Sequence, residues 1–169
     1  MKSHSNQDPN QDLNQLGAQV GQLLKANKQT IAVAESSTGG LISAALLAVP
    51  GASNYFRAGG VVYTRQAWEK LLNSSIKAVG GDKPLSEKTA LHLANTVRSQ
   101  LETDWGVGEI GAAGPSGTRY GNPAGYTCIA VVGPGVEETI TFETGNDDRV
   151  DNMWAFTQTA LGLLEQALK

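Results

Sequence analysis

The chain has 169 residues, a formal net charge of −3 and one cysteine, Cys128. This length suits a single domain, and the 13 basic residues are scattered rather than clustered as on a nucleic-acid-binding surface. One cysteine cannot form a disulfide within the chain, and no stretch approaches the roughly 18 apolar residues of a membrane span. We therefore expect a soluble, cytoplasmic protein that binds neither nucleic acid nor membrane.

The apolar pattern of the first half predicts helices that alternate with strands. Residues 1–11 are polar and predict a disordered tail, so that the domain covers residues 12–169. The elements predicted next, in chain order, are a helix over 12–26, a strand over 30–34, a helix over 39–48, a strand over 60–64, a helix over 64–72 and a loop over 73–85.

The second half opens with Ser86, a good N-cap for a helix with apolar residues on one face. The elements predicted after this helix are a strand over 106–112, a turn-rich segment over 113–125, strands over 126–132 and 137–143, and a helix over 147–168. Gly133-Pro134-Gly135 joins the last two strands and predicts an antiparallel hairpin. We therefore predict an α/β fold: a three-layer α/β/α sandwich with a mixed sheet in one domain.

Residues 30–40 are the most informative stretch of the chain. An apolar strand breaks into Glu35, three hydroxyl residues and Gly39-Gly40 just before a helix. Such a turn offers backbone N–H groups and small polar groups where α/β proteins hold anionic ligands. It lacks the P-loop spacing, and an equally good interpretation is that these residues only cap the helix. If the two glycine-rich loops at 35–40 and 113–125 follow neighbouring strands, both lie at one edge of the sheet.

The residue inventory restricts the chemistry. The histidines are His4 in the tail and His92 inside a helix, where we expect a surface or satisfied core residue. A Ser-His-Asp triad and a zinc site are therefore disfavoured, and we expect no cofactor. Any nucleophile would be a Ser or Thr activated by Lys, Tyr or a carboxylate. On spacing alone, Ser53 is a turn residue and Tyr63 a half-buried aromatic.

Several segments, taken together, resemble the C-terminal domain of the CinA (competence/damage-inducible) family over residues 12–168. Ala34–Gly40 matches the family pattern Ala-Glu-Ser-Cys-Thr-Gly-Gly, with Ser37 in place of the cysteine. The other matching segments are Pro50–Phe56, Gly60–Thr64, Gly111–Gly117 and Asn122–Gly125.

The family includes nicotinamide mononucleotide deamidases, so the resemblance implies a metal-free amidohydrolase that releases ammonia. It implies Ser53 as the nucleophile, with Tyr63 and Ser36 as further catalytic residues. The residues expected to bind the substrate are Glu35, Thr38, Gly39, Gly40, Arg65, Gly114, Pro115, Gly117 and Arg119. The expected partners are a small nucleotide-like amide and a second copy in a homodimer.

The chain departs from the family pattern at polar positions. The family's catalytic lysine corresponds to Trp68, and Lys70 points about 200° away around the helix. Arg65 stays protonated, so it could stabilise negative charge but not act as a base. Asp147 stands where the family has an arginine, a charge that Arg119 or Arg149 could supply instead.

Three hypotheses follow. The chain is a deamidase with a rearranged activating group, a hydrolase of a less anionic amide, or a catalytically silent relative that binds a ligand or partner. A base within reach of the Ser53 hydroxyl would favour catalysis. If Trp68 fills that space and Ser53 contacts only backbone, the binding hypothesis is favoured.

Overall fold

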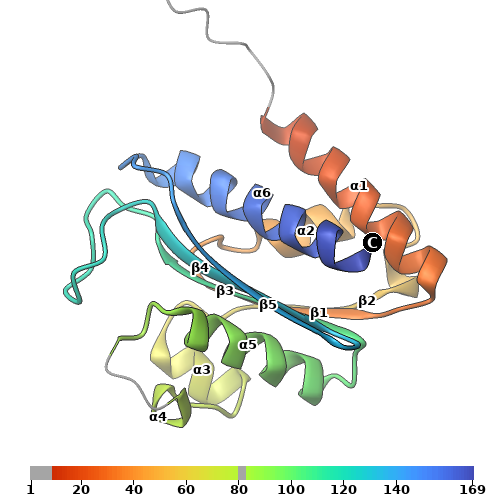
Figure 1. Ribbon diagram of the computed structural model, residues 1–169, viewed down its shortest axis with the longest axis horizontal. Helices are drawn as coiled ribbons and strands as arrows, with labels where there is room; N and C mark the ends of the chain where they lie inside the picture. The colour runs from red at the N-terminus through yellow and green to blue at the C-terminus, as the bar shows by residue number, and fades with distance from the viewer. Residues whose placement is uncertain (1–8, 80–82) are drawn as a thin grey trace, which may run out of the picture.

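A five-stranded mixed sheet lies between two layers of helices in the computed structural model, which describes residues 9–79 and 83–169 (Figure 1). The strands are β1 (Ile31–Glu35), β2 (Phe56–Val61), β3 (Trp105–Ala112), β4 (Tyr126–Gly133) and β5 (Val136–Glu143), in the order β2-β1-β3-β4-β5. β1 is parallel to β2 and β3, whereas β3, β4 and β5 pair antiparallel. The predicted three-layer sandwich and the hairpin are confirmed.

Helices cover both faces of the sheet. The helices are α1 (Pro9–Asn27), α2 (Leu41–Leu47), α3 (Arg65–Leu71), α4 (Ile76–Val79), α5 (Glu87–Gln100) and α6 (Arg149–Leu168), with a short 3-10 turn at Ala52–Asn54. α1, α2 and α6 cover one face, and α3, α4 and α5 cover the other (Figure 1). None of the helices in the described ranges is long and apolar enough to cross a membrane.

Each face of the sheet has its own apolar core. Ile31 and Val33 of β1 point into the core under α1, α2 and α6, while Ala32 and Ala34 point into the core under α3 and α5. This alternation follows from the two-residue period of a strand. Because both faces are covered, β1 is buried along its whole length, as its continuous apolar sequence predicts.

Small residues on the α5 side of the sheet let this helix approach closely. A Cβ on Gly108 of β3 would lie 2.0 Å from the backbone oxygen of Ala90 in α5, and one on Gly106 would meet Ala94 in the same way. α5 itself begins where predicted, because the Ser86 hydroxyl accepts a hydrogen bond from the Thr89 N–H at 3.2 Å.

The predicted boundaries are wrong in three places. The strand expected over 60–64 runs over Phe56–Val61, because Phe56 pairs with Ile31 and Val61 with Glu35 at the two ends of β1. The loop expected over 73–85 contains α4. α1 begins at Pro9, three residues before the predicted helix start, and residues 1–8 lie outside the described ranges, so the tail expected there stays a prediction.

We expect Gly108→Ala to lower the free energy of unfolding by about 1–3 kcal/mol, because the added methyl group must push α5 away from β3. Chemical denaturation measures the change. Gly162→Ala is the matched control: it lies in α6 with no neighbouring atom within 4 Å of its Cβ position, so it should stabilise by about 0.5–1 kcal/mol. A Gly108→Ala variant as stable as the wild type would contradict the close contact.

Candidate functional site

A cavity of about 620 Å³ lies at the carboxyl ends of the parallel strands. Because β1, β2 and β3 all run in the same direction, the loops that follow them meet at this edge. The two glycine-rich segments, 35–40 and 113–125, both reach it, as expected. This edge cavity is lined by Ser36, Tyr63, Thr64, Arg65, Trp68, Pro84, Leu85, Ile110, Gly111, Arg119 and Tyr120.

The buried carboxylate of Glu35 holds the first glycine-rich loop to the start of α2. It accepts hydrogen bonds from the backbone N–H groups of Gly40, Ile42 and Ser43 at 3.0–3.1 Å, and from the Ser43 hydroxyl at 2.6 Å. These N–H groups have no partner within the helix, and negative charge is favourable at a helix start. Glu35 therefore caps α2 from the strand before it.

Glu109 of β3 holds the same loop from beneath. Its Oε2 accepts hydrogen bonds from the backbone N–H groups of Ser36 and Thr38, both at 3.0 Å. Its Oε1 contacts the hydroxyls of Ser37 and Thr127. Glu109 is completely buried, and this desolvation raises the pKa of its carboxyl group above the ordinary value despite these hydrogen bonds.

Thr38 links the two carboxyl groups. Its hydroxyl oxygen lies 2.8 Å from Glu35 Oε2 and 2.9 Å from Glu109 Oε2. A threonine hydroxyl donates only one hydrogen, so both short contacts are hydrogen bonds only if one carboxyl group is protonated. Burial raises the pKa of the Glu109 carboxyl, which favours Glu109 as the carboxyl group that holds a proton.

The first loop therefore has a different role from the one predicted. Glu35 and Thr38 were expected to bind the substrate, but both are fully buried and bonded within the protein. Gly39 and Gly40 do not line the edge cavity either, and their positive φ angles of 65° and 102° form the turn into α2. Of the predicted loop residues, Ser36 lines the cavity.

Two arginines converge on Tyr120 at the edge cavity. Arg65 donates to the Tyr120 hydroxyl at 2.8 Å and Arg119 donates to it at 2.6 Å, while the Arg119 guanidinium carbon lies 4.9 Å from the centre of the Tyr120 ring. The hydrogen bond from Arg119 is the main reason why the pKa of Tyr120 is lowered. Both predicted arginines are thus brought together by a tyrosine that the sequence did not single out.

A third arginine lies at Tyr63. Arg149, in the first turn of α6, donates to the Tyr63 hydroxyl at 3.2 Å and to the carbonyl of Gly114 at 2.5 Å. Tyr63 follows the end of β2 and is 58% exposed, rather than lying in a strand as predicted. In the ranges that the structure describes, the one salt bridge joins Lys169 and Glu165, so none of the three arginines is neutralised by a carboxylate there.

Trp68, the residue that the resemblance matches to a catalytic lysine, lies in the wall of the edge cavity. Its side chain is buried, and its indole N–H donates to the carbonyl of Val62 at 2.6 Å. The indole therefore closes one wall of the edge cavity and provides no titratable group there.

Ser53 lies at the opposite edge of the sheet from Ser36 and Tyr63. It precedes the amino end of β2, whereas Ser36 follows the carboxyl end of β1, so the strands separate them by roughly 16 Å or more. Ser53 is exposed, and its backbone carbonyl accepts a hydrogen bond from Arg57 at 3.0 Å. The structure therefore does not unite the three predicted catalytic residues in one chain.

The predicted residues of the second loop shape its backbone. Gly114 has a φ of 113°, and a Cβ there would overlap the backbone oxygen of Asp147. A Cβ on Gly117 would overlap the oxygen of Asn122. Gly114, Pro115 and Gly117 do not line the edge cavity, so the loop presents Arg119 and Tyr120 instead.

Sequence reasoning missed Glu109 and Tyr120. A charged residue inside the otherwise apolar strand 105–112 is a signal that could have identified Glu109. Tyr120 stands beside Arg119 in the glycine-rich segment, but no sequence pattern shows that Arg65 reaches the same hydroxyl. Among the described residues, no group of three or more His, Cys, Asp or Glu side chains is placed to hold a metal ion.

Comparison with known proteins identifies relatives along nearly the whole chain. Residues 13–168 match the model of the CinA C-terminal domain family. A CinA-like protein of Desulforapulum autotrophicum is 38% identical over 150 residues, which are 89% of this chain and 36% of that protein. One from Desulfosudis oleivorans is 39% identical over 153 residues, 90% of this chain and 37% of the relative. The chain thus spans a little over a third of the length of these curated relatives.

A solved structure has the same architecture. The competence-damaged protein (CinA) superfamily protein from Escherichia coli superimposes with a TM-score of 0.85 at 28% sequence identity. The match covers 98% of this chain and 99% of that one.

The raised pKa of Glu109 predicts a pH-dependent stability. Because the pKa is raised in the folded protein, the stability contributed by the neutral carboxyl is complete below the unfolded pKa near 4.5 and is lost as the pH rises through the folded pKa. The side chain of Glu109→Gln stays neutral at every pH. The free energy of unfolding of this variant should therefore rise relative to that of the wild type as the pH rises, by about 1.4 kcal/mol for each pH unit by which the folded pKa exceeds the unfolded pKa.

Urea denaturation at several pH values between 4 and 8 measures this difference. Glu137→Gln, which changes an exposed glutamate on β5, is the control and should run parallel to the wild type. Parallel curves for Glu109→Gln and the wild type would contradict a raised pKa of Glu109.

Proposed function

This chain belongs to the CinA C-terminal domain family, and from that membership and its edge cavity we propose that it binds a small phosphorylated ligand of the nicotinamide mononucleotide type. The observation that carries the proposal is the set of three arginines, Arg65, Arg119 and Arg149, around two tyrosine hydroxyls at the carboxyl edge of the parallel strands. Guanidinium groups match the geometry of phosphate oxygens, which supports a phosphorylated ligand.

The hydrogen bonds among these side chains support the same proposal. Arg65 and Arg119 each donate a hydrogen bond to the neutral hydroxyl of Tyr120. The other N–H groups of each guanidinium take no part in that bond. A phosphate would supply the negative charge that the tyrosine lacks. The aromatic side chains of Tyr63, Trp68 and Tyr120 line the same cavity and suit a flat heteroaromatic ring.

The position of Ser53 counts against an amidohydrolase that works through this residue within one chain. The Ser53 carbonyl, not its hydroxyl, is engaged by Arg57, and the strands separate Ser53 from the edge cavity. Trp68 lies in the edge cavity and therefore does not fill the space beside Ser53. Among the described residues no base is hydrogen-bonded to the Ser53 hydroxyl, and this supports binding over Ser53-dependent hydrolysis.

Hydrolysis of a nucleotide carboxamide is the second candidate. The observation that favours it is that the hydroxyls of Ser36 and Tyr63 belong to residues lining the cavity that holds the arginines. In such a reaction Ser36 Oγ would bond to the carboxamide carbon, the C–N bond would break, and the amine would leave with the serine proton as ammonia. A water molecule would then hydrolyse the acyl-serine to the carboxylate and restore the serine.

We expect nicotinamide mononucleotide to bind and Arg119→Gln to weaken that binding. Loss of a charged hydrogen bond to phosphate costs about 1.5–3 kcal/mol, roughly 10- to 150-fold in Kd. Isothermal titration calorimetry measures both, and nicotinamide riboside, which lacks the phosphate, should bind the wild type correspondingly less tightly. Arg57→Gln is the matched control, because this exposed arginine lies at the opposite edge of the sheet. Equal affinity for the nucleotide and the riboside would contradict the phosphate role of the arginines.

Ammonia release from nicotinamide mononucleotide separates the two candidates. We expect no release by the wild type above the level of a Ser53→Ala variant, because no base contacts the Ser53 hydroxyl among the described residues. Release that disappears in Ser36→Ala but persists in Ser53→Ala would establish the second candidate. Release that depends on Ser53 would overturn the argument drawn from its position.

A further inference from the structure

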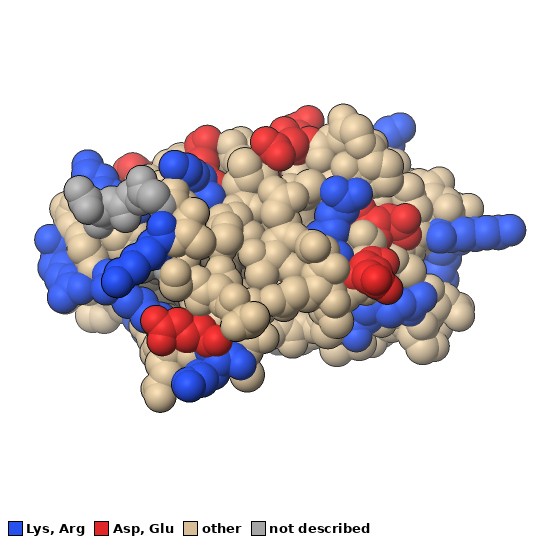
Figure 2. Space-filling model, turned by 90° about the horizontal axis from the view of Figure 1, so that it is seen from below, with Lys and Arg blue, Asp and Glu red and all other residues tan. Residues whose placement is uncertain are grey.

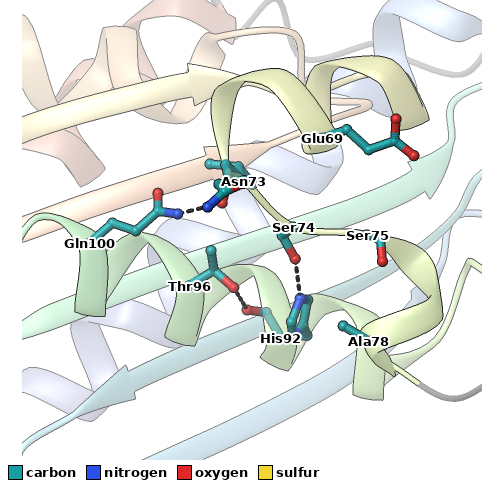
Figure 3. Close-up of a pocket in the computed structure, with 9 residues that line it drawn as sticks. Glu69, Asn73, Ser74, Ser75, Ala78, His92, Thr96 and Gln100 are labelled. Carbon is teal, nitrogen blue, oxygen red and sulfur yellow. Dashed lines mark hydrogen bonds between the residues drawn. The ribbon is translucent and has the colours of Figure 1, made fainter.

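A second cavity, of about 580 Å³, lies on the face of the molecule that α3, α4 and α5 cover, between these helices (Figure 3). None of its lining residues belongs to the edge cavity. Its polar groups come from Glu69, Asn73, Ser74, Ser75, His92, Thr96 and Gln100. We call it the helix cavity.

Ser74 and His92 form a close pair inside the helix cavity. The Ser74 Oγ lies 2.6 Å from His92 Nε2, and Figure 3 shows the two side chains pointing at each other across the gap between the segment before α4 and helix α5. Both side chains are half-buried. The Ser74 backbone N–H donates to the carbonyl of Trp68 at 3.2 Å, which fixes the serine relative to α3.

The environment of His92 suits a base. Partial burial lowers the pKa of His92 below its ordinary 6.5, so the ring is neutral at pH 7. A neutral ring that accepts the Ser74 hydroxyl at Nε2 carries its own hydrogen on Nδ1. In that tautomer the pair has the polarity of a serine nucleophile and its general base.

We propose that Ser74 is a nucleophile activated by His92 and that the helix cavity takes small uncharged esters. Ser74 Oγ would bond to the carbonyl carbon while its proton passes to His92 Nε2, and that proton would leave with the alcohol as the C–O bond breaks. A water molecule deprotonated by the same nitrogen would then release the acid and restore the serine. This activity is separate from the proposed function of the edge cavity.

The lining of the helix cavity argues for an uncharged substrate. Among the described residues the lining includes the carboxylate of Glu69 and no Lys or Arg, and the Lys and Arg side chains of this face gather mainly toward its ends (Figure 2). An anionic substrate would therefore find no counter-charge in this cavity.

The pair lacks the acid of a full triad. Among the described residues no carboxylate is hydrogen-bonded to the His92 ring, and the Glu69 carboxylate points away from it in Figure 3. An unsupported pair should react slowly with esters, so the sharper assay is covalent labelling with a fluorophosphonate. In that reaction Ser74 Oγ attacks phosphorus, fluoride leaves and the serine proton passes to His92.

The test is intact-protein and peptide mass spectrometry of the wild type with the fluorophosphonate. We expect one adduct, located on Ser74, with a labelling rate that falls at acidic pH with a midpoint below 6.5. Ser74→Ala should abolish the adduct, and His92→Gln should slow labelling by about 100-fold or more. Ser75→Ala, which removes a neighbouring hydroxyl of the same cavity, is the matched control and should label like the wild type.

Peptide mapping of the wild-type adduct keeps the test independent of whether the variants fold. An unlabelled wild type, or an adduct on any residue other than Ser74, would overturn the proposal. Equal labelling rates in His92→Gln and the wild type, with unchanged circular dichroism, would also overturn it. In each of these cases the pair only fastens the segment before α4 to α5.

Discussion

The edge cavity depends on two buried carboxyl groups beneath the first glycine-rich loop. Gly108 pairs with Ala34, so the next residues, Glu35 and Glu109, lie at the same level on neighbouring strands. Together the two carboxyl groups accept hydrogen bonds from the backbone N–H groups at the start of the loop and at the start of α2. Burying such groups is costly unless every one is bonded, so the loop keeps one conformation only while both carboxyl groups stay in place.

The direction of the parallel strands divides the polar residues of the chain between two edges of the sheet. The carboxyl edge gathers the arginines and the hydroxyls of Ser36 and Tyr63, while the turn that carries Ser53 lies at the amino edge. Ser53 lies between Ser36 and Tyr63 in the sequence, yet a whole strand separates it from both in space. The sheet topology therefore decides which polar residues meet at each edge of the sheet.

The sequence predicts the layers, the mixed sheet and most helices, because these follow from the period of the apolar residues. It predicts β2 poorly, since Arg57, Gly59 and Gly60 do not form an apolar alternation and the strand exists through its pairing with β1. In the site, Arg65 and Arg119 could be selected as cationic residues near turns. The role of Glu35 could not, because a strand-end carboxylate looks the same in sequence whether it faces a ligand or caps the following helix.

Trp68 lines the edge cavity and is hydrogen-bonded to a residue of the helix cavity. Its indole closes a wall of the edge cavity through the bond to Val62, and its backbone carbonyl accepts the N–H of Ser74 in the helix cavity. A substitution at this position therefore bears on both cavities: the new side chain resizes the first, and any shift of the backbone at residue 68 displaces the anchor of the second.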